Sequence, residues 1–219
     1  MRKVPLVTNE IYHVFNRGVN RGNIFFADND YKRLLEAVFH YRTNSTKFSY
    51  QKPFNDPVSL GSFEDSSREK GVAKVQIIAY CLMPNHFHFL VKQLVDGGIT
   101  SFVRHLFNSY AHYVNVKYGR IGPLLQGRFK NVHIESQEQL VHVSRYIHLN
   151  PLVAGLIPDL RNYRWSSYPI YCGVKDKDGI VDPEIVTNEF KSSNDYEKFV
   201  LDQADYGIAL ERIKHLLLE

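Results

Sequence analysis

The sequence predicts an α+β fold, an antiparallel β-sheet flanked by α-helices, with a short helical C-terminal extension. Segments with strand and helix character alternate along the chain, and we expect the helices to pack on one face of the sheet. The predicted strands over 73–82 and 86–91 are joined by a short turn at Pro84 and Asn85. A parallel pair needs a much longer crossover, so these two strands form an antiparallel hairpin. With 44% hydrophobic and 23% charged residues among 219, the chain has the composition of a globular protein.

Apolar spacing and turn signals place the elements before the hairpin. Residues 11–15 are β-branched or aromatic and predict a strand. Asp28 or Asp30 is the expected cap of a helix. The apolar residues of this helix recur at helical spacing: Leu34, Leu35, Val38 and Phe39. Residues 43–71 show no periodicity and are interpreted as a long surface loop.

After the hairpin, a helix is expected to begin at Thr100 or Ser101. A loop that contains glycines follows over 119–127, and residues 129–134 predict the fourth strand. These elements complete a sheet in which no strand requires a parallel neighbour.

The next predicted helix begins at Ser136, which has Gln139 at capping-box spacing. Pro151 is expected to end it, because the residue before a proline disfavours helical geometry. Beyond it, residues 190–199 and 206–218 predict short helices that form a cap or an appendage.

Charge divides the chain into two unlike parts. The net charge is +4, but residues 1–171 hold 21 Lys and Arg against 12 Asp and Glu, a net of +9. Residues 172–219 hold 6 against 11, a net of −5. The division predicts a basic domain over 1–171, suited to an anionic partner, and an acidic helical extension over 172–219.

Composition also excludes several classes of protein. The only cysteines, Cys81 and Cys172, cannot form a disulfide framework and fit a reducing compartment. No apolar run approaches the length of a membrane span, and the N-terminus lacks the apolar core of a signal peptide. We therefore expect a cytoplasmic protein that does not contact a membrane. Ten histidines favour metal chemistry through nitrogen and oxygen ligands over thiolate ligands.

His86 and His88 lie two residues apart in a predicted strand, so their side chains point to the same face. Phe87 and Phe89 point to the other face, into the core. Two imidazoles on one face can share a divalent metal ion. The alternative is two partly exposed histidines on the polar face of a half-buried strand, and spacing alone favours this alternative.

Tyr146 and Asn150 lie four residues apart in the helix that begins at Ser136 and therefore share a face. Asn150 offers an oxygen ligand suited to magnesium or manganese. If Asn150 joins His86 and His88 at a metal, the Tyr146 phenol is placed beside it as a candidate nucleophile. His142 lies one turn earlier on the same face and is an alternative ligand. An ordinary amphipathic helix would also explain this pattern.

Together these segments resemble a known family. The run LMPNHFHFLV is similar to the His-hydrophobe-His (HUH) signature of single-tyrosine transposases of the insertion-sequence-200-like class. The resemblance is strongest to its REP-associated tyrosine transposases. It covers residues 8–171 and includes, in order, YHVFNRGVNRGNIFF, GPLLQGRFKNVHIES, YIHLNPLVAGL and YRWSSYPIY.

The resemblance implies a ferredoxin-like or RRM-like arrangement and a transposase that nicks and rejoins single-stranded DNA. His86, His88 and Asn150 would hold Mg²⁺ or Mn²⁺, with asparagine where insertion-sequence relatives often have glutamine. Tyr146 would form a 5′-phosphotyrosine intermediate. The implied partner is single-stranded or hairpin DNA, no nucleotide cofactor is needed, and a homodimer is possible.

Basic residues in or beside the predicted loops are candidates for phosphate contacts: Arg17, Arg21, Arg120, Arg128 and Lys130. Arg128 is the strongest candidate, because it lies between a glycine and a strand. Several aromatic residues are candidates for base stacking: Phe25, Phe26, Tyr113, Tyr118 and Phe129. Taken singly, each of these residues is as well explained by core packing or by solvation.

Two other functions fit parts of the pattern. A non-catalytic nucleic-acid-binding protein on the same fold would need neither the metal nor the tyrosine. A metal-dependent nuclease that uses activated water would leave Tyr146 without a role.

Overall fold

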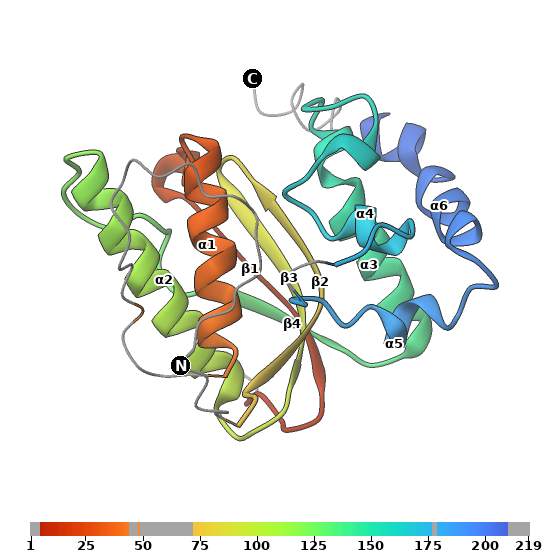
Figure 1. The fold of residues 1–219 in the computed structure, drawn as a ribbon, viewed down its shortest axis with the longest axis horizontal. Coiled ribbons are helices and arrows are strands. Elements are labelled where there is room, and N and C mark those ends of the chain that lie inside the picture. Colours follow the sequence, from red (N-terminus) through yellow and green to blue (C-terminus); the bar gives the residue numbers. More distant parts are fainter. Residues whose placement is uncertain (1–4, 44–47, 49–71, 177–178, 210–219) are drawn as a thin grey trace.

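A four-stranded antiparallel sheet forms the centre of the computed structural model, which describes residues 5–43, 48, 72–176 and 179–209 (Figure 1). Its strands run in the order β2 (Val75–Met83), β3 (His86–Gln93), β1 (Ile11–Arg17) and β4 (Lys130–Ile134). Every neighbouring pair is antiparallel, and β2 and β3 form the predicted hairpin. The predicted α+β fold with an antiparallel sheet is therefore confirmed.

Helices cover both faces of this sheet. Helices α1 (Asp28–Tyr41) and α2 (Gly98–Lys117) lie against one face, and α3 (Gln137–Val153) lies against the other (Figure 1). The prediction that the helices pack on one face is wrong. The physical reason lies in β2 and β3, where almost every residue is buried. Because successive side chains point to opposite faces of the sheet, both faces must be covered by other elements.

Shorter elements complete the described chain. Helix α6 (Ser193–Leu201) packs against α3, and this contact joins the acidic extension to the part of the chain that holds the sheet (Figure 1). The division of the chain at residue 171 stays a prediction. The short elements are two 3₁₀ helices, η1 (Val19–Arg21) and η2 (Leu160–Asn162), and three α-helices, α4 (Tyr168–Tyr171), α5 (Glu184–Thr187) and α6 (Ser193–Leu201).

Two helix starts differ from the predicted ones. Ala27 is the N-cap of α1, and the carboxylate of Asp30 accepts the backbone N–H groups of Phe26 and Ala27. An acidic side chain thus accepts hydrogen bonds from backbone N–H groups at the start of the helix, but it belongs to the third residue of the helix and not to the N-cap. Helix α2 begins at Gly98, before Thr100, because Gly97 adopts a φ of 65° and turns the chain into the helix.

Helix α3 begins as predicted, with the Ser136 hydroxyl accepting the backbone N–H of Gln139. Its predicted end at Pro151 is wrong, since the helix continues to Val153 with Pro151 inside it. A proline has no N–H to donate to the carbonyl of Ile147, four residues earlier. The side-chain amide of Asn150 donates to that carbonyl instead, at 3.4 Å, and to the carbonyl of Tyr146 at 2.7 Å.

Some predictions fall outside the described residues. The loop predicted over 43–71 lies almost wholly outside them, as does most of the helix predicted over 206–218. The helix predicted over 190–199 is shifted and appears as α6. Across the parts of the chain that the structure describes, none of the helices has the length and apolar character of a membrane span.

Candidate active site

The two histidines of the hairpin lie on the α3 face of the sheet. His86 is opposite Arg17 and His88 is opposite Phe15 in the pairing of β3 with β1. The intervening Phe87 is fully buried and stacks on Phe107 of α2, on the other face. The predicted alternation is therefore confirmed. His88 itself is only 5% exposed, so this face of the sheet is covered at that position.

Helix α3 places Tyr146 directly against His88. The centroid of the Tyr146 ring lies 5.5 Å from that of His88, in an edge-on arrangement. It lies 5.9 Å from the ring of His13, which belongs to β1. Tyr146 is nevertheless 53% exposed, so its phenol is accessible to a large substrate. Tyr146 from one sequence pattern thus lies beside His88 from the other.

Each histidine of the pair is hydrogen-bonded through its Nδ1 atom. The Nδ1 of His88 lies 2.8 Å from the Nε2 of His13, and the Nδ1 of His86 lies 2.6 Å from the Oδ1 of Asn85. The Nε2 of His88 is buried and has no hydrogen-bond partner among the described residues. His13 was not predicted as a site residue. The sequence does place His13 in the predicted strand 11–15. It does not show that this strand pairs with the predicted strand 86–91, which carries the two histidines.

Burial keeps the imidazoles of His13 and His88 neutral. Burial lowers the pKa of His13 to about 4. Burial, together with the nearby rings of His13 and His86, holds the pKa of His88 well below its usual value. A metal ligand must be the neutral imidazole, because the protonated ring has no lone pair to offer. The electrostatics of the site therefore favour the ligating form at neutral pH.

Asn150 lies at the end of α3, one turn beyond Tyr146. Its side-chain nitrogen donates to two carbonyl groups of its own helix, which leaves the side-chain oxygen as its remaining polar atom. His142 takes no part in the site. Its Nδ1 lies 2.7 Å from a guanidinium nitrogen of Arg145, and its ring contacts Phe199 of α6.

Two imidazoles and an amide oxygen are a donor set that suits a divalent ion such as Mg²⁺ or Mn²⁺. The buried and unpartnered Nε2 of His88 is the observation that fits such an ion. Clusters of three or more His, Cys, Asp or Glu side chains that could hold a metal are absent from the described residues.

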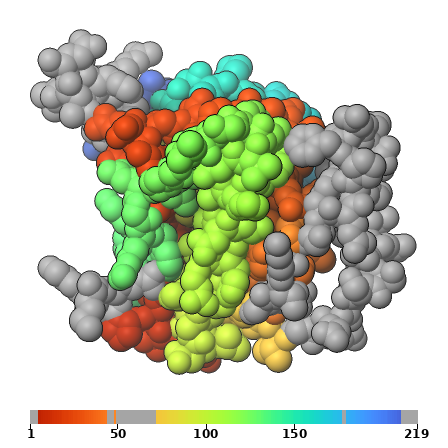
Figure 2. Space-filling model, turned by 90° about the vertical axis from the view of Figure 1, so that its left-hand side faces the viewer, coloured from red at the N-terminus to blue at the C-terminus, as the bar shows by residue number. Residues whose placement is uncertain are grey.

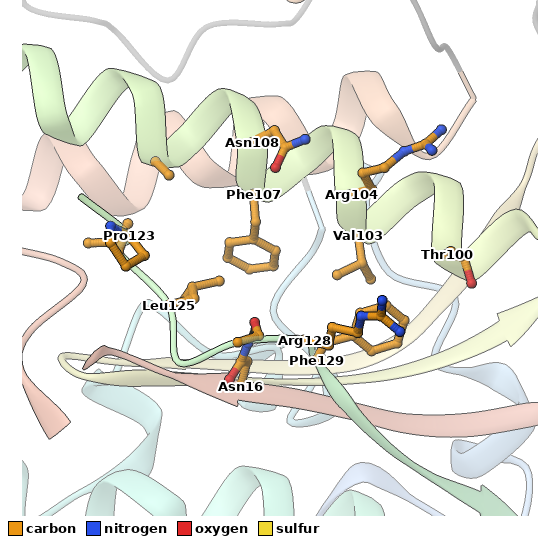
Figure 3. Close-up of a pocket in the computed structure, with 13 residues that line it drawn as sticks. Asn16, Thr100, Val103, Arg104, Phe107, Asn108, Pro123, Leu125, Arg128 and Phe129 are labelled. Atoms are coloured by element: carbon orange, nitrogen blue, oxygen red, sulfur yellow. Dashed lines mark hydrogen bonds between the residues drawn. The ribbon is translucent and has the colours of Figure 1, made fainter. Parts of the chain in front are cut away.

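A cleft of about 570 Å³ lies on the opposite face of the sheet, between α2 and the loop that precedes β4 (Figure 3). Its walls are mostly apolar, with Val103, Phe107 and Leu125 pointing into it. Arg104 and Arg128 also line it, so the cleft combines an apolar floor with two cations. Figure 2 shows α2, in green, running along this outer surface of the molecule.

The other predicted basic residues surround the end of β1. The guanidinium of Arg17 is exposed and donates to the Gln126 side chain at 2.6 Å. Arg21 is exposed in η1, and Lys130 is exposed at the start of β4. Arg120 stands apart from them, 5.7 Å from the centre of the Phe26 ring.

The predicted stacking residues fall into two groups. Phe25 is wrong as a candidate, because it is 2% exposed, stacks on Tyr31 and contacts Tyr110 in the core. The hydroxyls of Tyr113 and Tyr118 both donate to Asp30, which holds them in the structure. Phe26 is 46% exposed, beside Tyr118, and Phe129 lines the cleft.

Comparisons with known proteins agree with this geometry. Residues 64–150 match the model of a family described as IS200-like transposases. The fold matches the structure of a REP-associated tyrosine transposase bound to a REP hairpin, with a TM-score of 0.55 and 16% sequence identity. The match covers 84% of this chain and 92% of the other. A search of curated proteins finds no match. The family match confirms the predicted resemblance to IS200-like transposases, and the structural match confirms that the chain shares the fold of a REP-associated tyrosine transposase.

Proposed function

We propose that this protein is a metal-dependent transposase that nicks and rejoins single-stranded DNA through Tyr146. The observation that carries the proposal is the contact between the exposed Tyr146 ring and the buried ring of His88, 5.5 Å apart. A non-catalytic DNA-binding protein has no need of a phenol held beside the buried, neutral imidazole of His88.

The proposed reaction transfers a phosphoryl group twice. The Tyr146 oxygen, having lost its proton, attacks the scissile phosphorus while the bond to the 3′ oxygen breaks. That oxygen takes up a proton and leaves as a 3′ hydroxyl, and the 5′ phosphate stays bonded to Tyr146. In the second transfer a 3′ hydroxyl attacks the phosphotyrosine, a phosphodiester forms, and the phenol is released. Because the covalent intermediate keeps the phosphoester bond, no nucleotide cofactor is consumed.

The metal would be held by His86, His88 and Asn150. When bound, Mg²⁺ or Mn²⁺ supplies positive charge that offsets the charge developing on the phosphate oxygens. The protein itself contributes the orientation of the Tyr146 ring, which α3 fixes against the sheet. Holding the nucleophile in one geometry removes much of the entropic cost of the attack.

We propose single-stranded or hairpin DNA as the substrate, as in the bound REP hairpin of the structural relative. The position of Arg17 suggests where the DNA would run. Arg17 lies opposite His86 on the sheet, and its guanidinium donates a hydrogen bond to the Gln126 side chain. Gln126 belongs to the loop that also carries Arg128 at the cleft on the other face. Arginine side chains along this loop would contact phosphates, and Phe129 would stack on a base.

The test is a denaturing gel of labelled hairpin DNA incubated with the protein and Mn²⁺. A covalent protein–DNA band is expected with the wild type and is expected to disappear in Tyr146→Phe, which keeps the ring and its contacts. The control is Tyr206→Phe, because Tyr206 is also exposed but lies in the extension.

Three outcomes separate the candidate functions. Cleavage that survives Tyr146→Phe would point to a nuclease that uses activated water. Binding without cleavage in any variant would point to a non-catalytic DNA-binding protein. Loss of the covalent band in Tyr206→Phe as well would show that Tyr146 has no special role.

A further inference from the structure

We propose that His13 and Asn85 are positioning residues that fix the protonation pattern of the two histidines, so that both present an unprotonated Nε2 to one site. The proposal rests on the proposed function, since it takes His86 and His88 to be metal ligands. It assigns roles to two residues that do not themselves touch the metal or the substrate.

Asn85 settles the proton position in His86. The side-chain nitrogen of Asn85 donates to the carbonyl of Arg21 at 3.2 Å, which turns its side-chain oxygen toward His86. That oxygen accepts only, so the Nδ1 of His86, 2.6 Å away, must carry the proton. The Nε2 of a neutral His86 then holds the lone pair.

The turn around Asn85 is built to keep this orientation. The backbone N–H of Gly18 donates to the carbonyl of Asn85 at 2.8 Å, so β1 and the hairpin hold each other. A Cβ atom at Gly18 would lie 2.0 Å from the carbonyl oxygen of Gly22, so only glycine fits there. Asn85 is thus fixed through both its side chain and its backbone.

His13 plays the same part for His88. Of the two nitrogens that share the 2.8 Å hydrogen bond, one carries the proton. If the Nδ1 of His88 donates, its Nε2 keeps the lone pair. If His13 donates, the proton of His88 moves to Nε2, which is buried without a partner and would become an unsatisfied donor. In the first arrangement Nε2 is a lone pair that a bound metal ion would satisfy, whereas an N–H there could be satisfied by no metal, and this arrangement matches the one at His86.

The two positioning bonds therefore act in parallel. Metal-binding histidines commonly donate their second ring nitrogen to an oxygen or nitrogen acceptor, which fixes the ring and raises its basicity. In this chain the two acceptors come from different places, one from the hairpin turn and one from β1. We expect the loss of either acceptor to weaken metal binding while the ligands themselves stay intact.

The first measurement is the ¹⁵N NMR spectrum of the histidine rings in the full-length, metal-free protein. Ring nitrogens with and without a proton differ in chemical shift, so the spectrum reports the tautomer directly. In the wild type we expect the proton on Nδ1 of both His86 and His88. In His13→Leu we expect His88 to lose this single pattern, whereas His13→Gln supplies an amide oxygen as acceptor and should restore it.

The second measurement is the affinity for Mn²⁺ by isothermal titration calorimetry. His13→Leu and Asn85→Ala should each weaken binding about 10- to 100-fold, and His13→Gln should recover most of the loss. The control is His133→Leu, since His133 lies on β4 and bonds to Glu10 instead of to the pair. Thermal unfolding checks that each variant is folded.

The outcomes distinguish this proposal from the proposed function. A proton on Nε2 of His88 in the wild type, or a Mn²⁺ affinity of His13→Leu equal to that of His133→Leu, would overturn the positioning role alone. A wild-type protein that binds no Mn²⁺ would overturn the metal centre and the positioning role together.

Discussion

Asn150 performs a task within its own helix in addition to the proposed role as a ligand. Its side-chain nitrogen donates to the carbonyl of Ile147. Pro151 would be the usual helical donor to this carbonyl, but it has no N–H. The same nitrogen donates to the carbonyl of Tyr146 at 2.7 Å. The proline is thus tolerated inside α3, and the orientation of the Asn150 amide leaves its oxygen for a ligand.

The substitution Asn150→Asp separates these two tasks. A carboxylate keeps an oxygen ligand but has no N–H to donate, so we expect Mn²⁺ binding to remain while the protein loses about 1 kcal/mol of unfolding free energy. Asn150→Leu should lose both. Urea denaturation and calorimetry of the same samples measure the two effects, and loss of Mn²⁺ binding in Asn150→Asp would contradict the ligand role.

Among the elements, a buried carboxylate links the start of α1 to the last turn of α2 and to the residue that follows it. Asp30 is fully buried. It accepts two backbone N–H groups at the start of α1, the hydroxyls of Tyr113 and Tyr118, and the ammonium of Lys117 at 2.7 Å. Burial alone would raise the pKa of Asp30, but the hydrogen bonds, led by that from Lys117, hold it below its usual value of 3.8.

This arrangement predicts a definite pH dependence. A carboxyl whose pKa is lower in the folded state stabilises the protein above its unfolded pKa and loses that contribution as the pH falls through the folded value. Asp30→Asn should cost about 3 kcal/mol at pH 7, because it leaves Lys117 and its neighbours without their charge partner. The difference from the wild type in urea denaturation should shrink below about pH 4. A difference that stays constant down to pH 2 would contradict this account.

The contact between α3 and α6 depends on a buried polar network. The ring of His148 is neutral, because burial lowers its pKa to about 3. Its Nδ1 lies 2.7 Å from the hydroxyl of Tyr196 in α6, and its Nε2 lies 2.8 Å from the hydroxyl of Ser167. The Tyr196 hydroxyl also contacts that of Ser144, so α6 is bonded to the helix that carries Tyr146.

The substitution Tyr196→Phe tests this network without a change in shape. It removes one hydroxyl and leaves His148 and Ser144 each short of a buried partner, so we expect a loss of about 1 to 3 kcal/mol in unfolding free energy. Tyr206→Phe changes an exposed tyrosine and should be neutral. Equal stability of both variants would show that the network does not hold α6 in place.

The elements show how far the sequence predicts this structure. The hairpin, the face shared by His86 and His88, and the start of α3 all follow from local rules, and the structure confirms them. His13 does not, because its partner is 75 residues away and its role depends on the pairing of β1 with β3. The continuation of α3 past Pro151 could not be predicted either. The carbonyl that Pro151 leaves without a donor is bonded by the Asn150 side chain, and residue spacing does not reveal such a bond.

At the scale of the whole molecule, the positive charge lies in the part of the chain that carries the proposed active site, and the negative charge lies in the C-terminal extension. The net charge of +9 belongs to residues 1–171, which hold the sheet, the histidines and the cleft, and the net charge of −5 belongs to residues 172–219. We expect DNA to bind the basic part, with an affinity that falls as salt rises, since each neutralised phosphate releases counterions.

The substitution Arg128→Ala measures one such contact. It should weaken the binding of single-stranded DNA and reduce the slope of log affinity against log salt by about 0.7, the value for one phosphate. Lys175→Ala removes an exposed cation from the acidic extension and should leave the slope unchanged. Fluorescence anisotropy at several salt concentrations decides the matter, and equal slopes for both variants would remove Arg128 from the binding surface.

The contact between Tyr146 and His88 has a consequence for the order of events. Both rings belong to one chain, and Tyr146 is the exposed candidate nucleophile beside His88, since the nearby Cys81 is fully buried. Given the proposed function, such a site holds one DNA end covalently at a time. A second cut must therefore wait until the first end has been passed to a free 3′ hydroxyl, so the exchange of two strands at one molecule is sequential and never simultaneous.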